Sequence, residues 1–122
     1  MNLLFVMAGG ALGSGARFLV GRGVQALAGP DQPYGTLAVN LAGGLLMGLL
    51  AGLLARGIVG EGWRLFAGAG VLGGFTTFSA FSLDLVRLAE RGAAAGALGY
   101  ALLSVIGSAA AVLGGMQLAR AA

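Results

Sequence analysis

Cysteine and histidine are both absent from this chain of 122 residues, and only 9% of its residues are charged. The missing side chains exclude disulfides, a thiol nucleophile, an imidazole general base and the usual ligands of zinc and iron. The shortage of charge excludes an ordinary soluble domain, in which about 25% of residues are charged. With 58% hydrophobic residues, the composition predicts a membrane protein.

Lysine is absent too, so all 7 basic residues are arginines, against 4 acidic residues. The arginines occur singly rather than in the basic clusters that nucleic-acid binding requires, so nucleic acid is not an expected partner. We interpret them as anchors at the ends of apolar segments. No carboxylate lies centrally in an apolar segment, where proton-coupled exchange normally needs one. Together with the missing histidine and cysteine, this argues against an enzyme.

Charged residues divide the chain into four apolar runs, each close to the roughly 20 residues that cross a bilayer as a helix. Between the first two runs, the glycine and prolines of Gly29 to Pro33 predict a turn. The sequence therefore predicts an all-α membrane protein, a single domain of residues 1–122 with four transmembrane helices. A cleaved signal sequence is an alternative for the first run, but its start lacks a basic region. The runs are Asn2 to Ala16 (extendable to Gly21), Gln32 to Ala55, Leu65 to Leu83, and Gly92 to Ala119.

The arginines outside the first run give no preferred orientation in the membrane. Four crossings place three of them on each side, whereas topology normally follows an excess of basic residues in the cytoplasmic loops. One interpretation is that small differences in flanking position still select a single topology. The other is dual topology, in which oppositely inserted copies pair as an antiparallel homodimer with a two-fold axis. The two groups are Arg56, Arg64 and Arg120, and Arg22, Arg87 and Arg91.

Small and polar residues form one stripe on the second run, since Thr36, Asn40, Gly44, Gly48 and Gly52 recur every four residues. Glycines at this spacing are typical of a face on which membrane helices pack closely. Asn40 adds a carboxamide with two N–H donors and one acceptor. Such a group either joins helices or serves a passing polar species.

The third run contains a predicted break, because two adjacent glycines, Gly73 and Gly74, precede the β-branched Thr76 and Thr77, a weak combination for helix propagation. In a membrane, irregular backbone survives only inside protein or beside water. A break frees backbone carbonyls from Gly73 to Thr76, and such carbonyls can coordinate a small cation. Alternatively, water or neighbouring hydroxyls satisfy them.

Two phenylalanines follow the predicted break, and Phe78 and Phe81 share a helix face by their spacing. Such residues ordinarily belong to a core. A phenyl ring edge nevertheless carries partial positive charge, so two edges in a narrow path can hold an anion. Ser79 and Ser82 lie on the adjoining face.

Polar residues also line one face of the fourth run, where Tyr100, Ser104 and Ser108 recur every four residues. Single serines in membrane helices often bond to their own backbone, but three aligned polar residues favour a lined track. In the first run, Arg17 either snorkels to the interface or forms an electropositive mouth that draws anions.

Three motifs resemble the CrcB/Fluc family of fluoride channels, small bacterial membrane proteins with four helices. The resemblance covers all four runs in order, and the third motif is highly specific. The motifs are GGALGSGARF at 9–18, GTLAVN at 35–40 and GGFTTFSAFS at 73–82.

This resemblance implies a dual-topology antiparallel homodimer in the bacterial inner membrane. The dimer would contain two separate fluoride pathways and a structural sodium ion at its centre, and would export cytoplasmic fluoride passively. The backbone carbonyls of Gly73 and Thr76 would bind sodium, and Asn40 would donate to fluoride. The other expected pathway residues are Phe78 and Phe81 as its aromatic part, Tyr100, Ser104 and Ser108 as a polar track, Arg17 as the basic residue of the first helix, and, from the residues alone, Thr36, Ser79 and Ser82.

Two positions depart from the family pattern. Ala80 stands where the family usually has a threonine or serine, and Asp84 where it often has glutamate. The alternative functions are a small multidrug or cation exporter, which would need a carboxylate in the first run, and a membrane subunit without transport activity.

Overall fold

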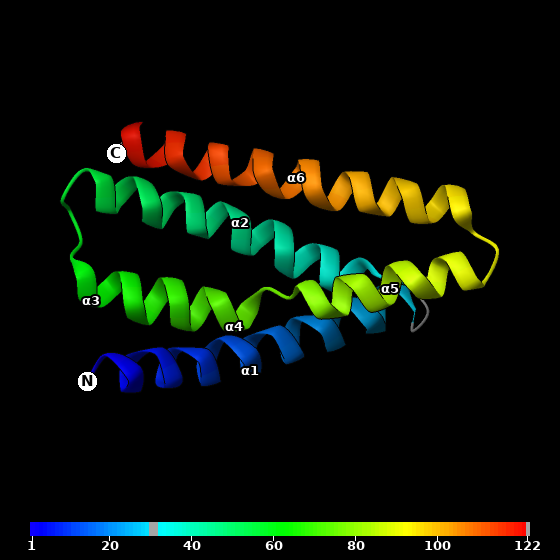
Figure 1. Cartoon of the computed structure of the whole chain (residues 1–122), viewed down its shortest axis with the longest axis horizontal. Helices are drawn as coiled ribbons and strands as arrows, with labels where there is room; N and C mark the ends of the chain where they lie inside the picture. Colours follow the sequence, from blue (N-terminus) through cyan, green and yellow to red (C-terminus); the bar gives the residue numbers. More distant parts are fainter. Residues whose placement is uncertain (30–31, 122) are drawn as a thin grey trace.

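The computed structural model describes residues 1–29 and 32–121 and consists of helices arranged side by side (Figure 1). Four of its helical segments are long and apolar enough to cross a membrane, as the sequence predicts. Three of these segments are single helices, and the third in chain order is composite. The single helices are α1 (Asn2–Ala28), α2 (Tyr34–Ala55) and α6 (Ala94–Ala121); the composite segment, Glu61–Glu90, contains α3 (Glu61–Trp63), the π-helical η1 (Arg64–Leu72), α4 (Gly73–Phe75) and α5 (Phe78–Glu90).

The connections between helices contain glycine in conformations that other residues rarely adopt. Gly29, Gly57 and Gly92 have φ angles of 96°, 71° and 80°, and each lies just beyond the end of a long helix. A residue with a Cβ is strained there, so these glycines stop the helices. Within the predicted turn from Gly29 to Pro33, Pro30 and Asp31 lie outside the described residues.

Both chain termini and the connection between α2 and α3 lie at one end of the bundle (Figure 1). The connection from α5 to α6 lies at the other end. The arginines in the last turns of α5 and α6, Arg87 and Arg120, therefore belong to opposite ends. This arrangement agrees with the expected division of the arginines into two equal groups.

The most extensive helix contact in the described structure joins α2 to α6, and glycine makes it possible. A Cβ on Gly44 would lie 3.0 Å from the Ser108 carbonyl oxygen, and one on Gly48 would overlap the Val112 backbone. From the other side, a Cβ on Gly115 would overlap the backbone of Leu45. The predicted stripe on α2 is therefore a packing face along its glycine half, where backbones meet without intervening side chains.

A second close contact joins α1 to η1 and α4. A Cβ on Gly13 would overlap the carbonyl of Val71, and one on Gly74 would lie 2.6 Å from the Gly10 carbonyl oxygen. Backbone therefore packs directly on backbone here as well. By contrast, many large apolar side chains point outward, among them Leu19 and Ile106 at 69% and 63% exposure, as expected for helices surrounded by lipid.

Two extended residues separate α4 from α5. Thr76 has φ −87° and ψ 158°, and Thr77 has φ −150° and ψ 124°, while Gly73 is helical at φ −61° and ψ −38°. The irregular backbone thus lies at the two threonines rather than at the glycines. Glycine costs a helix only about 1 kcal/mol, and the absence of a Cβ on Gly74 permits the contact with α1. We call Thr76 and Thr77 the linker.

Candidate ion-binding site

The side chain of Asn40 makes two hydrogen bonds with the backbone of Thr77. Its Nδ2 donates to the Thr77 carbonyl oxygen at 3.1 Å, and its Oδ1 accepts from the Thr77 amide at 2.9 Å. The carboxamide thus pairs with an extended residue as a neighbouring β-strand would. One N–H of the Asn40 amide remains for another partner.

The hydroxyl groups around the linker make local hydrogen bonds. Thr77 Oγ1 accepts from the Ala80 amide at 3.1 Å and caps the start of α5. Thr76 Oγ1 donates to the Leu72 carbonyl at 3.0 Å, and Ser82 Oγ donates to the Phe78 carbonyl at 2.9 Å. Of these side chains, Thr77 replaces the backbone acceptor that the Ala80 amide lacks at the start of α5. The Leu72 carbonyl accepts from the Thr76 amide as well as from the Thr76 hydroxyl.

The linker also redirects the backbone amides that would pair with the predicted sodium ligands. In a continuous helix the Thr77 amide would donate to Gly73, and the Ala80 amide to Thr76. Here the first donates to Asn40 and the second to the Thr77 side chain. Between the two carbonyls in sequence, that of Gly74 accepts from Arg17 Nε at 3.0 Å.

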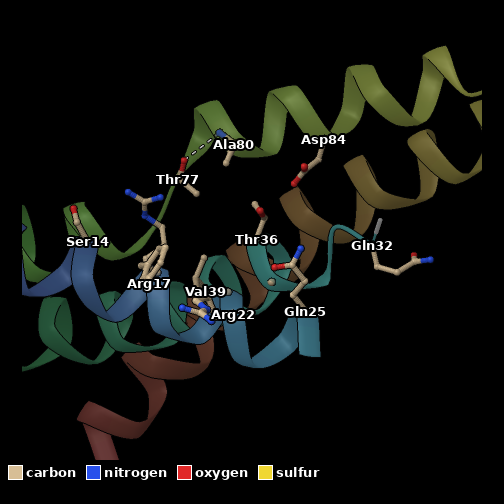
Figure 2. Close-up of a pocket in the computed structure, with 13 residues that line it drawn as sticks. Ser14, Arg17, Arg22, Gln25, Gln32, Thr36, Val39, Thr77, Ala80 and Asp84 are labelled. Carbon is tan, nitrogen blue, oxygen red and sulfur yellow. Dashed lines mark hydrogen bonds between the residues drawn. The ribbon is translucent and has the colours of Figure 1, made fainter. Parts of the chain in front are cut away.

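A cavity of about 480 Å³ lies on one side of the linker; we call it the Arg17 cavity. Figure 2 shows Arg17 rising from α1 toward the linker, with the Asp84 carboxylate approaching from α5. Arg22 adds a second guanidinium, which stands 5.8 Å from the Phe18 ring. The cavity therefore contains two arginines and one carboxylate. Its lining is Ser14, Arg17, Phe18, Gly21, Arg22, Gln25, Gln32, Gly35, Thr36, Val39, Thr77, Ala80 and Asp84.

A second cavity, of about 350 Å³, is lined by half of the predicted pathway residues; we call it the Asn40 cavity. Amide, hydroxyl and phenyl groups come together there, and no charged side chain is among the described lining residues. Ser104 within it is 6% exposed, and its Oγ has no hydrogen-bond partner among the described residues. The lining is Asn40, Gly43, Gly44, Met47, Thr76, Thr77, Phe78, Phe81, Ser104, Val105, Ser108 and Val112.

Three aromatic rings pack in a row that begins at the Asn40 cavity and ends on α6. The centroids of Phe78 and Phe81 are 5.5 Å apart, and those of Phe81 and Tyr100 are 5.2 Å apart. The Tyr100 hydroxyl donates to Asp84 Oδ2 at 3.2 Å and also interacts with Thr36. The rings and hydroxyls form a continuous row from one cavity toward the other.

The structure brings together most, but not all, of the residues singled out in the sequence. Ser79 and Ser82 line neither cavity; the Ser79 hydroxyl lies 3.4 Å from that of Thr77. Gly73 also lies outside both linings, whereas Thr76 belongs to the Asn40 cavity.

Sequence reasoning did not assign Thr77 and Asp84 to the site. Thr77 looked like part of the break, and Asp84 lies near the end of its apolar run. The available signal was the i+3 spacing of Asp84 from Phe81, which places both on the face toward α6.

Comparisons with known proteins agree with this architecture. The family model described as CrcB-like protein, Camphor Resistance (CrcB), matches residues 4–116. A protein of Mesorhizobium japonicum named fluoride-specific ion channel FluC is 51% identical to this chain, and the match covers 98% of this chain and 96% of that protein. The corresponding protein of Caulobacter sp. (strain K31) is 56% identical over 98% and 94%, and that of Phenylobacterium zucineum 57% over 97% and 94%. The chain belongs to the CrcB-like protein family.

Proposed function

We propose that this chain forms a fluoride-selective channel that lets cytoplasmic fluoride leave passively across the bacterial inner membrane. The relatives named as fluoride-specific channels support the choice of ion. The observation that carries the proposal is the Asn40 cavity, whose lining is rich in neutral donors and includes Ser104, a buried hydroxyl without a partner among the described residues. A buried polar group is costly unless it is satisfied, and an anion stripped of water needs such donors.

Neutral donors suit passage better than a full charge does. Fluoride is small and strongly hydrated, so the path must replace its water with N–H and O–H groups. Asn40, Ser104 and Ser108 supply these groups, and the ring edges of Phe78 and Phe81 add weak positive potential. A cation at this depth would hold the ion too strongly for rapid release, because Coulomb energy grows in a low dielectric. The arginines of the other cavity instead gather anions at the entrance.

The functional unit we propose is an antiparallel dual-topology homodimer. The linker lies near the middle of the bundle's length (Figure 1), which corresponds to a third helix broken in mid-membrane. Irregular backbone at that depth needs protein around it, and a second, inverted copy would provide it. The equal division of arginines between the two ends permits both insertions.

We further propose that a sodium ion binds at the linker of this dimer. The carbonyls of Gly73 and Thr76 are the ones whose helical donors are redirected, and Arg17 engages the Gly74 carbonyl between them. Carbonyl oxygens are suitable ligands for a hard cation. One chain would supply two ligands and its inverted partner two more, so that the ion would join the two linkers.

Fluoride efflux from liposomes tests the proposal. Purified protein should dissipate an outward fluoride gradient much faster than protein-free vesicles do, and chloride loaded in parallel should remain inside. A small cation exporter would instead move a lipophilic cation in exchange for protons that flow down an imposed proton gradient. Fluoride retention equal to that of empty vesicles would refute the channel and leave the non-transporting alternative.

A further inference from the structure

The linker separates the two cavities at a single residue. Thr77 is the only residue common to the described linings of the Arg17 cavity and the Asn40 cavity. Thr77 therefore borders both cavities, and its conformation affects any path between them at this point.

Among the described residues, Asn40 is the hydrogen-bond partner that Thr77 has outside its own segment. Its carbonyl and amide both bond to the Asn40 carboxamide, which lies 37 residues away in sequence. Within the described part of the chain its hydroxyl bonds locally, to the Ala80 amide and Ser79. An extended residue between two helices loses substantial conformational freedom, worth about 1–2 kcal/mol per residue, so its geometry requires such partners.

We propose that Asn40 is a positioning residue that fixes Thr77 as the partition between the two cavities, in addition to any contact it makes with the ion. Its two bonds to the backbone hold the linker extended, orient the Thr77 hydroxyl to cap α5, and leave one N–H directed elsewhere. The effect on ion passage rests on the proposed function, whereas the positioning of Thr77 by Asn40 does not.

The two roles of Asn40 make different demands on the side chain. An ion donor needs only the N–H that the linker does not use. A positioning residue needs Oδ1 to accept from the Thr77 N–H and Nδ2 to donate to the Thr77 carbonyl. An ionised carboxyl group of the same shape meets only the first demand. Asn40→Asp therefore keeps one of the two bonds and removes the neutral donor, whereas Asn40→Ala removes both bonds.

Amide hydrogen exchange of the full-length protein in lipid nanodiscs, followed residue by residue by NMR, tests the positioning role without relying on transport. In Asn40→Ala the Thr77 amide should exchange about tenfold faster, as expected for the loss of one buried hydrogen bond. Amides in the contact between α2 and α6 should keep their rates. Asn40→Asp keeps the acceptor for the Thr77 amide but not the donor to the Thr77 carbonyl, so it should accelerate Thr77 exchange less than Asn40→Ala does, although fluoride efflux falls.

Ser108→Ala is the matched control, because Ser108 lines the same cavity and its loss should leave Thr77 exchange unchanged. Asn40→Ser, whose hydroxyl is too short to reach Thr77, replaces Asn40→Ala if that variant does not fold, and should show the same acceleration. Unchanged Thr77 exchange in the folded Ala or Ser variant would overturn the inference. So would equal acceleration throughout the chain. Absence of fluoride efflux from the unsubstituted protein would refute the channel alone, since the exchange comparison does not use fluoride.

Discussion

The phenol hydroxyl of Tyr100 donates a 3.2 Å hydrogen bond to the carboxylate of Asp84 and thereby joins α6 to α5. Tyr100 is buried, and its ring packs against Phe81 at 5.2 Å. Asp84 lines the Arg17 cavity, so the bond restrains a negative charge beside a space that we assign to an anion. The position of this carboxylate therefore influences how readily an anion enters.

Tyr100→Phe should slow fluoride efflux and lower the stability moderately. The substitution keeps the ring contact with Phe81 and removes the donor to Asp84, which costs about 1.5 kcal/mol. Released from Tyr100, the carboxylate can turn into the Arg17 cavity and repel anions. Efflux from liposomes and thermal unfolding measure the two effects. Asp84→Asn is the control, because it keeps an acceptor for Tyr100 without the charge; if it slows efflux as much, repulsion is not the cause.

The sequence predicts the number and approximate positions of the spans, because these depend on composition. It predicts their limits less well, since α1 continues through Arg17 and Arg22 to Ala28 and the third segment reaches from Glu61 to Glu90. Uncharged runs of membrane length become helices whatever their partners are, and the small-residue stripe on α2 packs as its spacing indicates. The linker lies in the predicted motif, and its Thr76 belongs to the predicted break from Gly73 to Thr76, but Gly73 and Gly74 are helical and Thr77 is extended. Local propensity favours a break at Gly73 and Gly74, whereas tertiary contacts of Gly74 with α1 keep these residues helical and move the extended backbone to Thr76 and Thr77.

The pairing of Asn40 with Thr77 could not be predicted from the sequence. Helix periodicity places Asn40 on a face, but it does not show which residue of another helix lies opposite. The same limit applies to Asp84, whose partner Tyr100 belongs to a different span. Contacts between helices depend on their relative height in the bundle, which no local pattern encodes.

Ser104→Ala should reduce efflux without destabilising the protein. The Ser104 hydroxyl is buried and has no partner among the described residues, so removing it should leave the unfolding temperature equal or higher. An unsatisfied buried polar group costs about 1–3 kcal/mol. A serine that matters only for packing would produce neither effect. A lower unfolding temperature together with normal efflux would mean that the hydroxyl stabilises the fold and does not serve the ion.

Gly48→Ala should unfold or strongly destabilise the protein. Its new methyl group would overlap the Val112 backbone, and α2 and α6 could relieve the clash only by moving apart, at a cost of about 1–3 kcal/mol or more. Gly23→Ala is the matched control, since nothing lies within 4 Å of the added carbon and alanine favours a helix by about 1 kcal/mol. Thermal unfolding in the same detergent should rank Gly23→Ala at or above the unsubstituted protein and Gly48→Ala well below it.

Arg17→Gln should reduce efflux most at low ionic strength. The guanidinium lines the Arg17 cavity and attracts anions over a distance that shrinks from about 30 Å at 0.01 M salt to about 10 Å at 0.1 M. The deficit relative to the unsubstituted protein should therefore narrow as an inert salt is added. Arg17→Lys keeps the charge but loses the planar donor to the Gly74 carbonyl. A deficit in Arg17→Gln that is independent of salt would assign Arg17 to holding the linker rather than to attracting anions.

Dual topology predicts that each end of the bundle is exposed on both faces of the membrane. Because the chain has no cysteine, single cysteines introduced at opposite ends are clean reporters. Ile58, which is 55% exposed in the connection after α2, and Ala94, the exposed first residue of α6, suit this purpose. In intact spheroplasts an impermeant thiol reagent should label about half of either variant, since a cytoplasmic excess of basic residues normally sets orientation and the two ends are balanced.

The same charge balance supplies the control for this experiment. Two lysines appended after Ala122 would add basic residues to the end that carries Arg56, Arg64 and Arg120, and should turn most copies so that this end is cytoplasmic. Labelling of Ile58→Cys should then fall and that of Ala94→Cys should rise. Efflux should fall as well, because copies inserted in one direction cannot form the antiparallel pair. Without the added lysines, nearly complete labelling of one reporter and almost none of the other would overturn dual topology. Full efflux from a uniformly oriented population would show that the path does not need the inverted partner.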